Sequence, residues 1–138
     1  MQDNKFSILI VEDHPFQLIA TQMQLNRLGF FRLTPALDAD EAREECACRD
    51  EPFDLLLCDI NLPNTNGIEL LSELVEAGHI RQAVFLSCRE AGELQALQKD
   101  LREQGLPVLA CLAKPLDQWA LLHALEADRG LSLTAPTN

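Results

Sequence analysis

The stretch Leu55–Pro63, which reads LLLCDINLP, decides the fold of this chain. It contains most of the apolar run Phe53–Cys58, in which four apolar residues stand in succession instead of alternating with polar ones. A strand with one solvated face would alternate, so this run is typical of a parallel strand that helices cover on both faces. The run stops at a carboxylate, Asp59. In open parallel sheets, the residues after the strand ends form the binding crevice.

Three more runs of this kind occur at Phe6–Val11, Ala83–Leu86 and Val108–Ala113, and we expect a weaker strand at Phe31–Leu37. Between them, apolar residues repeat at three- and four-residue steps, which predicts helices. The predicted helices are Pro15–Leu28, Asp40–Arg49, Gly67–Ala77, Glu90–Gln104 and Asp117–Asp128. Strict alternation of strands and helices indicates an α/β fold, and right-handed crossovers place helices on both faces of one parallel sheet.

The length of 138 residues fits one domain with a core of its own. We expect the domain at residues 1–129 and a loose tail or linker start at residues 130–138. The 22 acidic and 11 basic residues give a net charge of −11, which disfavours binding to nucleic acid or anionic membranes.

The five cysteines include no CxxC pair, so neither a zinc site nor a disulfide framework is predicted. Cys46 and Cys48 are two positions apart on a predicted helix and face different ways. The sequence shows no secretory signal and no apolar run of membrane-spanning length. We therefore expect a cytoplasmic protein.

Charged and hydroxyl side chains follow the predicted strands at the edge where those strands end. Glu12 and Asp13 follow the first run, Asp59 the third, Ser87 the fourth and Lys114 the fifth. Three carboxylates brought together repel one another and imply a cation, and oxygen ligands alone suit Mg²⁺ or Mn²⁺. A hydroxyl and an ammonium beside the metal can hold a phosphoryl group, with Asp59 as the nucleophile and Lys114 neutralising charge.

The sequence closely resembles the receiver domain of bacterial response regulators over residues 6 to about 128. The matching segments are Ile8–Pro15, Leu55–Pro63, Gly67, Leu86–Ser87 and Ala113–Pro115. The resemblance implies a flavodoxin-like, doubly wound sheet of five parallel strands in the order 2-1-3-4-5, flanked by five helices. It places the chain in two-component signal transduction.

The resemblance also implies a role for each matching residue. Asp59 accepts phosphate from a sensor histidine kinase or phosphotransfer protein, and the domain then switches its binding to a downstream effector. Lys114 pairs with Asp59 and then with the phosphoryl group, to which Ser87 donates a hydrogen bond. The Mg²⁺ ligands are Glu12, Asp13, Asp59 and the backbone carbonyl of Asn61. Pro63 and Gly67 shape the loop after Asp59, and the bond before Pro115 is cis.

The sequence departs from the family pattern at Cys111, where receivers usually carry Tyr or Phe. We therefore expect the signal to leave through the loop after Ser87 and through the fourth helix. The segment from Ser87 to Lys114 is longer than usual and loosely resembles receivers that precede cyclic-di-GMP phosphodiesterase domains. The chain is a single-domain receiver or part of a longer protein, and it could form a homodimer through the fourth helix, fifth strand and fifth helix.

Other functions remain open on the sequence. A receiver that no longer takes phosphate would act as a protein-binding adapter. The presence of all five core side chains argues against this function, and the missing aromatic residue keeps it open. A Mg-dependent phosphotransferase or nuclease would need a second spaced carboxylate, which Asp59-Ile60-Asn61 lacks. The receiver reading predicts no separate substrate, because the domain assists its own phosphorylation and dephosphorylation. His14 is expected at the rim of the site and not among the metal ligands.

Overall fold

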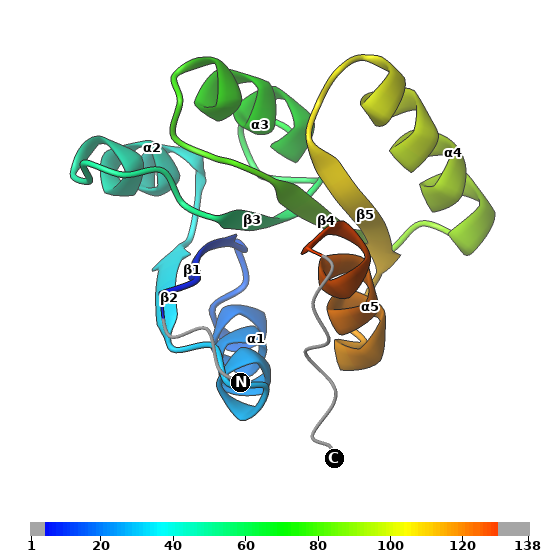
Figure 1. Ribbon diagram of the computed structural model, residues 1–138, viewed down its shortest axis with the longest axis horizontal. Coiled ribbons are helices and arrows are strands. Elements are labelled where there is room, and N and C mark those ends of the chain that lie inside the picture. Colours follow the sequence, from blue (N-terminus) through cyan, green and yellow to red (C-terminus); the bar gives the residue numbers. More distant parts are fainter. Residues whose placement is uncertain (1–4, 130–138) are drawn as a thin grey trace.

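Five parallel strands form a sheet in the computed structural model, which describes residues 5–129. The strands are β1 (Ser7–Val11), β2 (Arg32–Ala36), β3 (Leu55–Asp59), β4 (Ala83–Ser87) and β5 (Val108–Ala113). Within the same residues, the helices are α1 (Pro15–Arg27), α2 (Ala39–Ala47), α3 (Gly67–Glu76), α4 (Ala91–Glu103) and α5 (Gln118–Arg129). The strand order β2-β1-β3-β4-β5 confirms the predicted doubly wound α/β fold (Figure 1).

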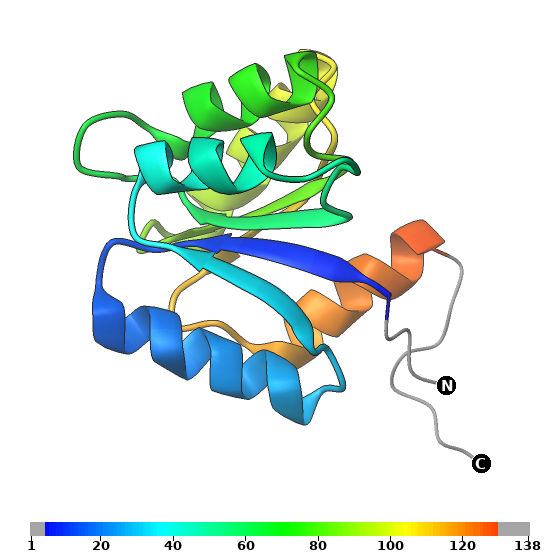
Figure 2. The same ribbon diagram turned by 90° about the vertical axis from the view of Figure 1, so that its left-hand side faces the viewer.

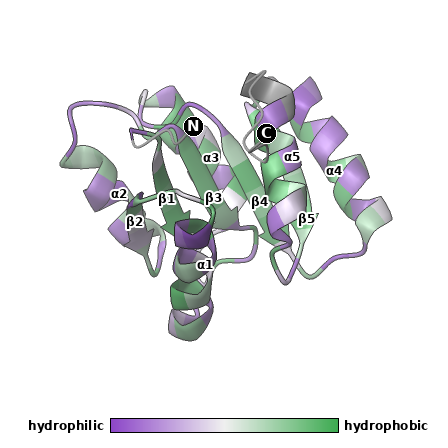
Figure 3. Cartoon of the chain, turned by 60° about the horizontal axis from the view of Figure 1, so that its bottom comes forward, coloured by the Kyte–Doolittle hydropathy of each residue, from purple (hydrophilic) through white to green (hydrophobic). Residues whose placement is uncertain are grey.

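The sheet has a hydrophobic core on each face, which explains the unbroken apolar runs. Ile8 and Ile10 of β1 pack with residues of α1 and α5, whereas Leu9 and Val11 pack with residues of α2, α3 and α4. Figure 2 shows the two layers of helices on opposite sides of the sheet. The hydropathy colouring of Figure 3 shows the strongly apolar central strands between them. Every residue of β1, β3 and β4 is buried.

Local signals set the ends of several helices. Pro15 is the first residue of α1, where its missing N–H costs no hydrogen bond. The Asp117 side chain accepts a hydrogen bond from the N–H of Trp119 at 2.9 Å, so it caps the first turn of α5. Gly78, with φ of 80°, follows the end of α3 in the left-handed region that favours glycine.

The element boundaries differ from the predicted ones by small shifts. Strand β3 begins at Leu55, because Phe53 forms only an isolated bridge with Ile80. Asp59 and Ser87 are the last residues of their strands and do not follow them. The predicted tail at residues 130–138 lies outside the described residues. None of the helices in the described range has the length and apolar composition that a bilayer crossing requires.

Candidate functional site

Acidic side chains from two neighbouring strands meet at the carboxyl-terminal edge of the sheet. Strands β1 and β3 pair in parallel, with Val11 opposite Cys58, so the next residues, Glu12 and Asp59, lie side by side. Both are largely buried, with exposed fractions of 5% and 6%. Asp13 is half-buried next to Glu12. Buried carboxylates are costly unless paired, so this edge requires positive charge.

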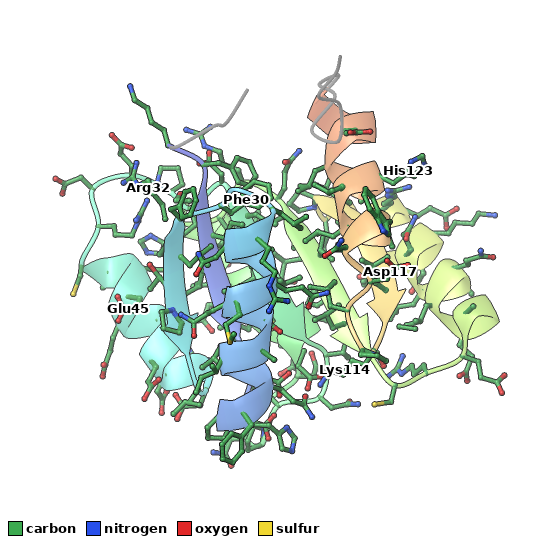
Figure 4. All side chains as sticks on the ribbon, turned by 90° about the horizontal axis from the view of Figure 1, so that it is seen from below. Phe30, Arg32, Glu45, Lys114, Asp117 and His123 are labelled. Atoms are coloured by element: carbon green, nitrogen blue, oxygen red, sulfur yellow. The ribbon has the colours of Figure 1, made fainter. Side chains whose placement is uncertain are left out.

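Lys114 supplies one positive charge to the cluster from the end of β5. Its Nζ lies 2.7 Å from Asp59 Oδ2 and 3.1 Å from Glu12 Oε1. Burial acts to lower the pKa of Lys114, but its hydrogen bonds to Asp59 and Glu12 outweigh this effect and raise the pKa above its ordinary value. Figure 4 labels Lys114 at the opposite end of the sheet from Arg32, the first residue of β2. The ammonium is therefore held charged against the two buried carboxylates.

His14 lies at the outer side of the acidic pair. Its Nδ1 is 3.0 Å from Glu12 Oε2 and 3.3 Å from Asp13 Oδ1. The hydrogen bond to Glu12, together with the charge of Asp13, raises the pKa of His14. The ring is 62% exposed, as a rim position requires, and it touches both carboxylates.

The donor set of this edge fits a divalent cation. Asp13 Oδ1 is a buried side-chain atom for which the described residues provide no hydrogen bond. Glu12 and Asp59 contact the ammonium of Lys114, and Asp13 adds a third carboxylate next to Glu12, so negative charge remains. Carboxylate oxygens are the ligands that Mg²⁺ prefers. Atoms of Glu12, Asp13 and His14 lie within 4.8 Å of one another. The N–H of Asn61 donates to Asp59 Oδ1 at 3.0 Å, which brings the backbone of Asn61 to the same carboxylate.

Ser87 ends β4 beside this cluster. Asp59 pairs with Leu86 across β3 and β4, so Ser87 is the next residue along the neighbouring strand. Ser87 is only 1% exposed, and its Oγ accepts a hydrogen bond from the N–H of Arg89 at 3.2 Å. Its carbonyl accepts from the N–H of Lys114 at 2.8 Å, which joins the ends of β4 and β5.

The backbone around Asp59 has a close contact that only glycine permits. A Cβ on Gly67 would lie 2.5 Å from the carbonyl oxygen of Asp59, and the N–H of Gly67 donates to the Ile60 carbonyl at 2.7 Å. Gly67 therefore allows the first turn of α3 to approach the end of β3. The predicted cis bond between Lys114 and Pro115 is confirmed.

The structure adds one site contact that the sequence reasoning missed. Gln17 Oε1 lies 3.3 Å from Nζ of Lys114, so three side chains surround the ammonium. Gln17 is four residues after Asp13, in the first turn of α1, which starts at the same edge of the sheet. That spacing is the only signal in the sequence that could have identified it.

Known proteins resemble the chain over nearly all of its described length. The sequence profile of the response regulator receiver domain matches residues 8–126. Sensor protein EvgS of Escherichia coli K12 is 35% identical over 114 residues, or 81% of this chain, while the chain spans only 9% of EvgS. The probable chemotaxis protein CheY of Rhizobium etli is 27% identical over 126 residues, which are 91% of this chain and 94% of that protein. The solved signal receiver domain of an HD domain-containing protein from Pseudomonas fluorescens Pf-5 has a TM-score of 0.70 and 27% identity, covering 88% of this chain and 91% of that one.

Proposed function

The chain belongs to the response regulator receiver domain family of two-component signalling, and from this premise we propose that Asp59 accepts a phosphoryl group. The donor is the phosphohistidine of a sensor kinase or a phosphotransfer protein. One observation carries the proposal: Asp59 is buried at the carboxyl edge, and its Oδ2 lies 2.7 Å from the Lys114 ammonium, which also contacts Glu12.

The proposed transfer uses Asp59, the Lys114 ammonium that touches it, and Ser87 at the end of the neighbouring strand. An Asp59 carboxylate oxygen attacks phosphorus, the P–N bond of the phosphohistidine breaks with its electron pair going to the imidazole nitrogen, and an acyl phosphate forms. The Lys114 ammonium, 2.7 Å from Oδ2, neutralises charge on the transferred group. Ser87 turns its hydroxyl from the N–H of Arg89 and donates to a phosphoryl oxygen.

We assign a Mg²⁺ site, which Mn²⁺ can also occupy, to the same edge. The protein ligands are the carboxylates of Glu12, Asp13 and Asp59 and the backbone carbonyl of Asn61. When bound, the cation neutralises charge on the phosphoryl oxygens. His14 competes for Glu12 and Asp13 when it is protonated, because its ring contacts both of them.

The proposed output route runs through α4 and β5. Gln98 of α4 accepts a hydrogen bond from the N–H of Cys111 at 3.0 Å, and Arg102 donates to the carbonyls of Val108 and Leu109. These polar links join α4 to the outer edge of β5, at the strand that carries Cys111 in place of an aromatic ring. When the Ser87 hydroxyl releases the N–H of Arg89, the loop before α4 shifts. The links between α4 and β5 then carry this shift to the edge strand. Unchanged amide chemical shifts over residues 87–104 after addition of beryllofluoride would overturn this route.

The outer face of β5 is the proposed contact for further partners. A groove of about 530 Å³ between α4 and α5 is lined by Arg102, Leu109 and His123, among other residues. We assign to this face the downstream effector or a second copy of the chain, within a receiver domain of residues 1–129. Light scattering of the chain with and without beryllofluoride tests for the dimer. If the dimer forms, the measured mass should increase when beryllofluoride is added.

Incubation with acetyl phosphate and Mg²⁺, followed by intact mass spectrometry, tests the phosphoacceptor role. We expect one added phosphoryl group on the natural protein and none on Asp59→Asn. Asp54→Asn is the matched control, because it alters a carboxylate at the other end of β3 and leaves the adduct unchanged. Absence of an adduct on the natural protein, both here and with a phosphorylated histidine kinase, would favour the adapter function. Release of product from a phosphoester substrate would favour an enzyme.

A further inference from the structure

Two glutamines of α1 reach the same loop between β5 and α5. Gln17 Oε1 accepts a hydrogen bond from Nζ of Lys114 at 3.3 Å, and Gln24 Nε2 donates to the carbonyl of Leu116 at 2.8 Å. They are seven residues apart, so they lie two turns apart on one face of the helix. Both line a cavity of about 400 Å³ between α1 and the loop, together with Ala20 and Pro115. One glutamine therefore binds the ammonium and the other binds the backbone of the loop.

We propose that Gln17 is a positioning residue, which holds the Lys114 ammonium in place for phosphoryl transfer to Asp59. An ammonium has three N–H donors, and the three acceptors around this one are Asp59, Glu12 and Gln17. Asp59 and Glu12 are also proposed cation ligands, and the Asp59 carboxylate is the group that becomes phosphorylated. Gln17 is the neutral acceptor that belongs to neither group, so its contact survives both events.

The contact matters because a lysine side chain has four rotatable carbon–carbon bonds. Holding this side chain in one geometry costs rotamer entropy. Loss of the Gln17 oxygen removes a restraint on Lys114 without changing the charge of the site. We therefore expect a lower rate of transfer and an unchanged affinity for Mg²⁺. This inference rests on the proposed function, since it concerns the reaction of Asp59.

Gln17→Met and Gln24→Met form a matched pair for the test, because methionine has nearly the same length and helix propensity as glutamine. The rate of phosphorylation by acetyl phosphate is measured against donor and Mg²⁺ concentration. For Gln17→Met we expect a maximal rate about threefold to tenfold lower, since a partly exposed bond to a charged group is lost, with the same half-saturating Mg²⁺. For Gln24→Met we expect a maximal rate within about twofold of the natural one, because its bond is to the Leu116 carbonyl.

A second readout uses the metal-free, unphosphorylated protein. The ε-ammonium ¹H–¹⁵N signal of Lys114 is followed by NMR, and we expect Gln17→Met to broaden it or speed its hydrogen exchange, whereas Gln24→Met leaves it unchanged. The inference is overturned if Gln17→Met retains both the natural rate and the natural ammonium signal, or if both variants slow the reaction equally. If the natural protein takes no phosphate, the proposed function fails, and the ammonium signal still decides whether Gln17 restrains Lys114.

Discussion

Asp54 immediately precedes strand β3 and Asp59 is the last residue of that strand, and their surroundings differ. At the amino-terminal end, Asp54 Oδ2 accepts hydrogen bonds from the N–H and the hydroxyl of Ser7, at 2.9 and 3.3 Å. Arg81 lies 3.6 Å from the other oxygen, Oδ1, and Arg49 donates to the Ser7 hydroxyl at 3.3 Å. Both oxygens of Asp54 therefore have protein partners, and cations stand beside them.

At the carboxyl-terminal end, the protein leaves the cluster incomplete. Asp59 uses one oxygen for the N–H of Asn61 and the other for Lys114. Asp13 Oδ1 has no hydrogen bond among the described residues and faces the exposed ring of His14, whose Nδ1 lies 3.3 Å away. Glu12 and Asp59 share the ammonium of Lys114 there, and Asp13 adds a third carboxylate. The fold therefore satisfies a carboxylate at one end of the strand and holds, at the other end, a carboxylate cluster whose oxygens lack some of their hydrogen-bond partners. Such an arrangement costs stability and is expected where a ligand must bind.

Replacement of Lys114, at the carboxyl-terminal end of the sheet, is expected to have the largest effect on the rate of phosphorylation. Lys114→Met removes the ammonium that touches Asp59, so this charge no longer neutralises the transferred phosphoryl group. We expect the rate of phosphorylation by acetyl phosphate to fall about 100-fold, the scale typical for loss of one electrostatic stabiliser. Lys99→Met, at an exposed position of α4, is the control and should leave the rate unchanged. Equal rates in the two variants would contradict the role of Lys114.

Removal of one carboxylate at each end should change stability in opposite directions. Asp54→Ala leaves Ser7 without its acceptor, and we expect the free energy of unfolding to fall by about 2 kcal/mol. Asp13→Ala removes a carboxylate that repels its neighbours, and we expect a gain of about 0.5–1 kcal/mol without divalent cations. Urea unfolding in the presence of a chelator measures both. A loss of stability in Asp13→Ala would show that the carboxyl end is as complete as the amino end.

Mg²⁺ should stabilise the natural protein by binding at the carboxyl-terminal end of β3, and not at the end near Asp54. A ligand present at ten times its dissociation constant adds about 1.4 kcal/mol to the free energy of unfolding. We expect this gain in the natural protein and in Asp54→Ala, and its loss in Asp13→Ala. Thermal unfolding with and without Mg²⁺ measures the effect, and Ca²⁺ gives a comparison of cation preference. A similar gain in all three proteins would place the cation elsewhere.

Alkaline pH should weaken the carboxyl end by a small amount. The folded-state pKa of Lys114 is raised, so its stabilising charge is fully present below the ordinary pKa of 10.5 and is lost as pH rises through the raised value. The partly exposed ammonium makes this worth no more than about 1 kcal/mol. The chain has no tyrosine to obscure the transition, and Lys114→Met corrects for the titration of cysteines. The stability difference between the natural protein and this variant should shrink above pH 10.5, and a constant difference would contradict the charge pairing.

The fold was predictable because its signal is local. Runs such as Leu55–Cys58 are apolar without interruption because each strand faces two cores, and the structure confirms both. The strand at Arg32–Ala36 gave a weaker signal because it is an edge strand, in which all residues but Ala36 are exposed or half-buried. The convergence of Glu12 and Asp59 also followed from position, since parallel strands end at one edge.

The remaining contacts depend on how side chains from distant elements meet. Nothing in the sequence pairs Gln98 with the N–H of Cys111, because the contact depends on where α4 packs against β5. The same holds for Gln17 and Lys114, which are far apart in the chain. The satisfied Asp54 was not predicted either, because no rule assigns polar partners at the amino ends of parallel strands.

The identity of the modified residue is the most direct test of the central claim. The protein is phosphorylated with acetyl phosphate and Mg²⁺ and then reduced with borohydride, which converts an aspartyl phosphate to homoserine. Peptide mass mapping then finds the altered position. We predict homoserine at position 59 and unchanged aspartate at positions 13 and 54. Homoserine at either of those positions, with Asp59 intact, would contradict the assignment of the phosphoacceptor.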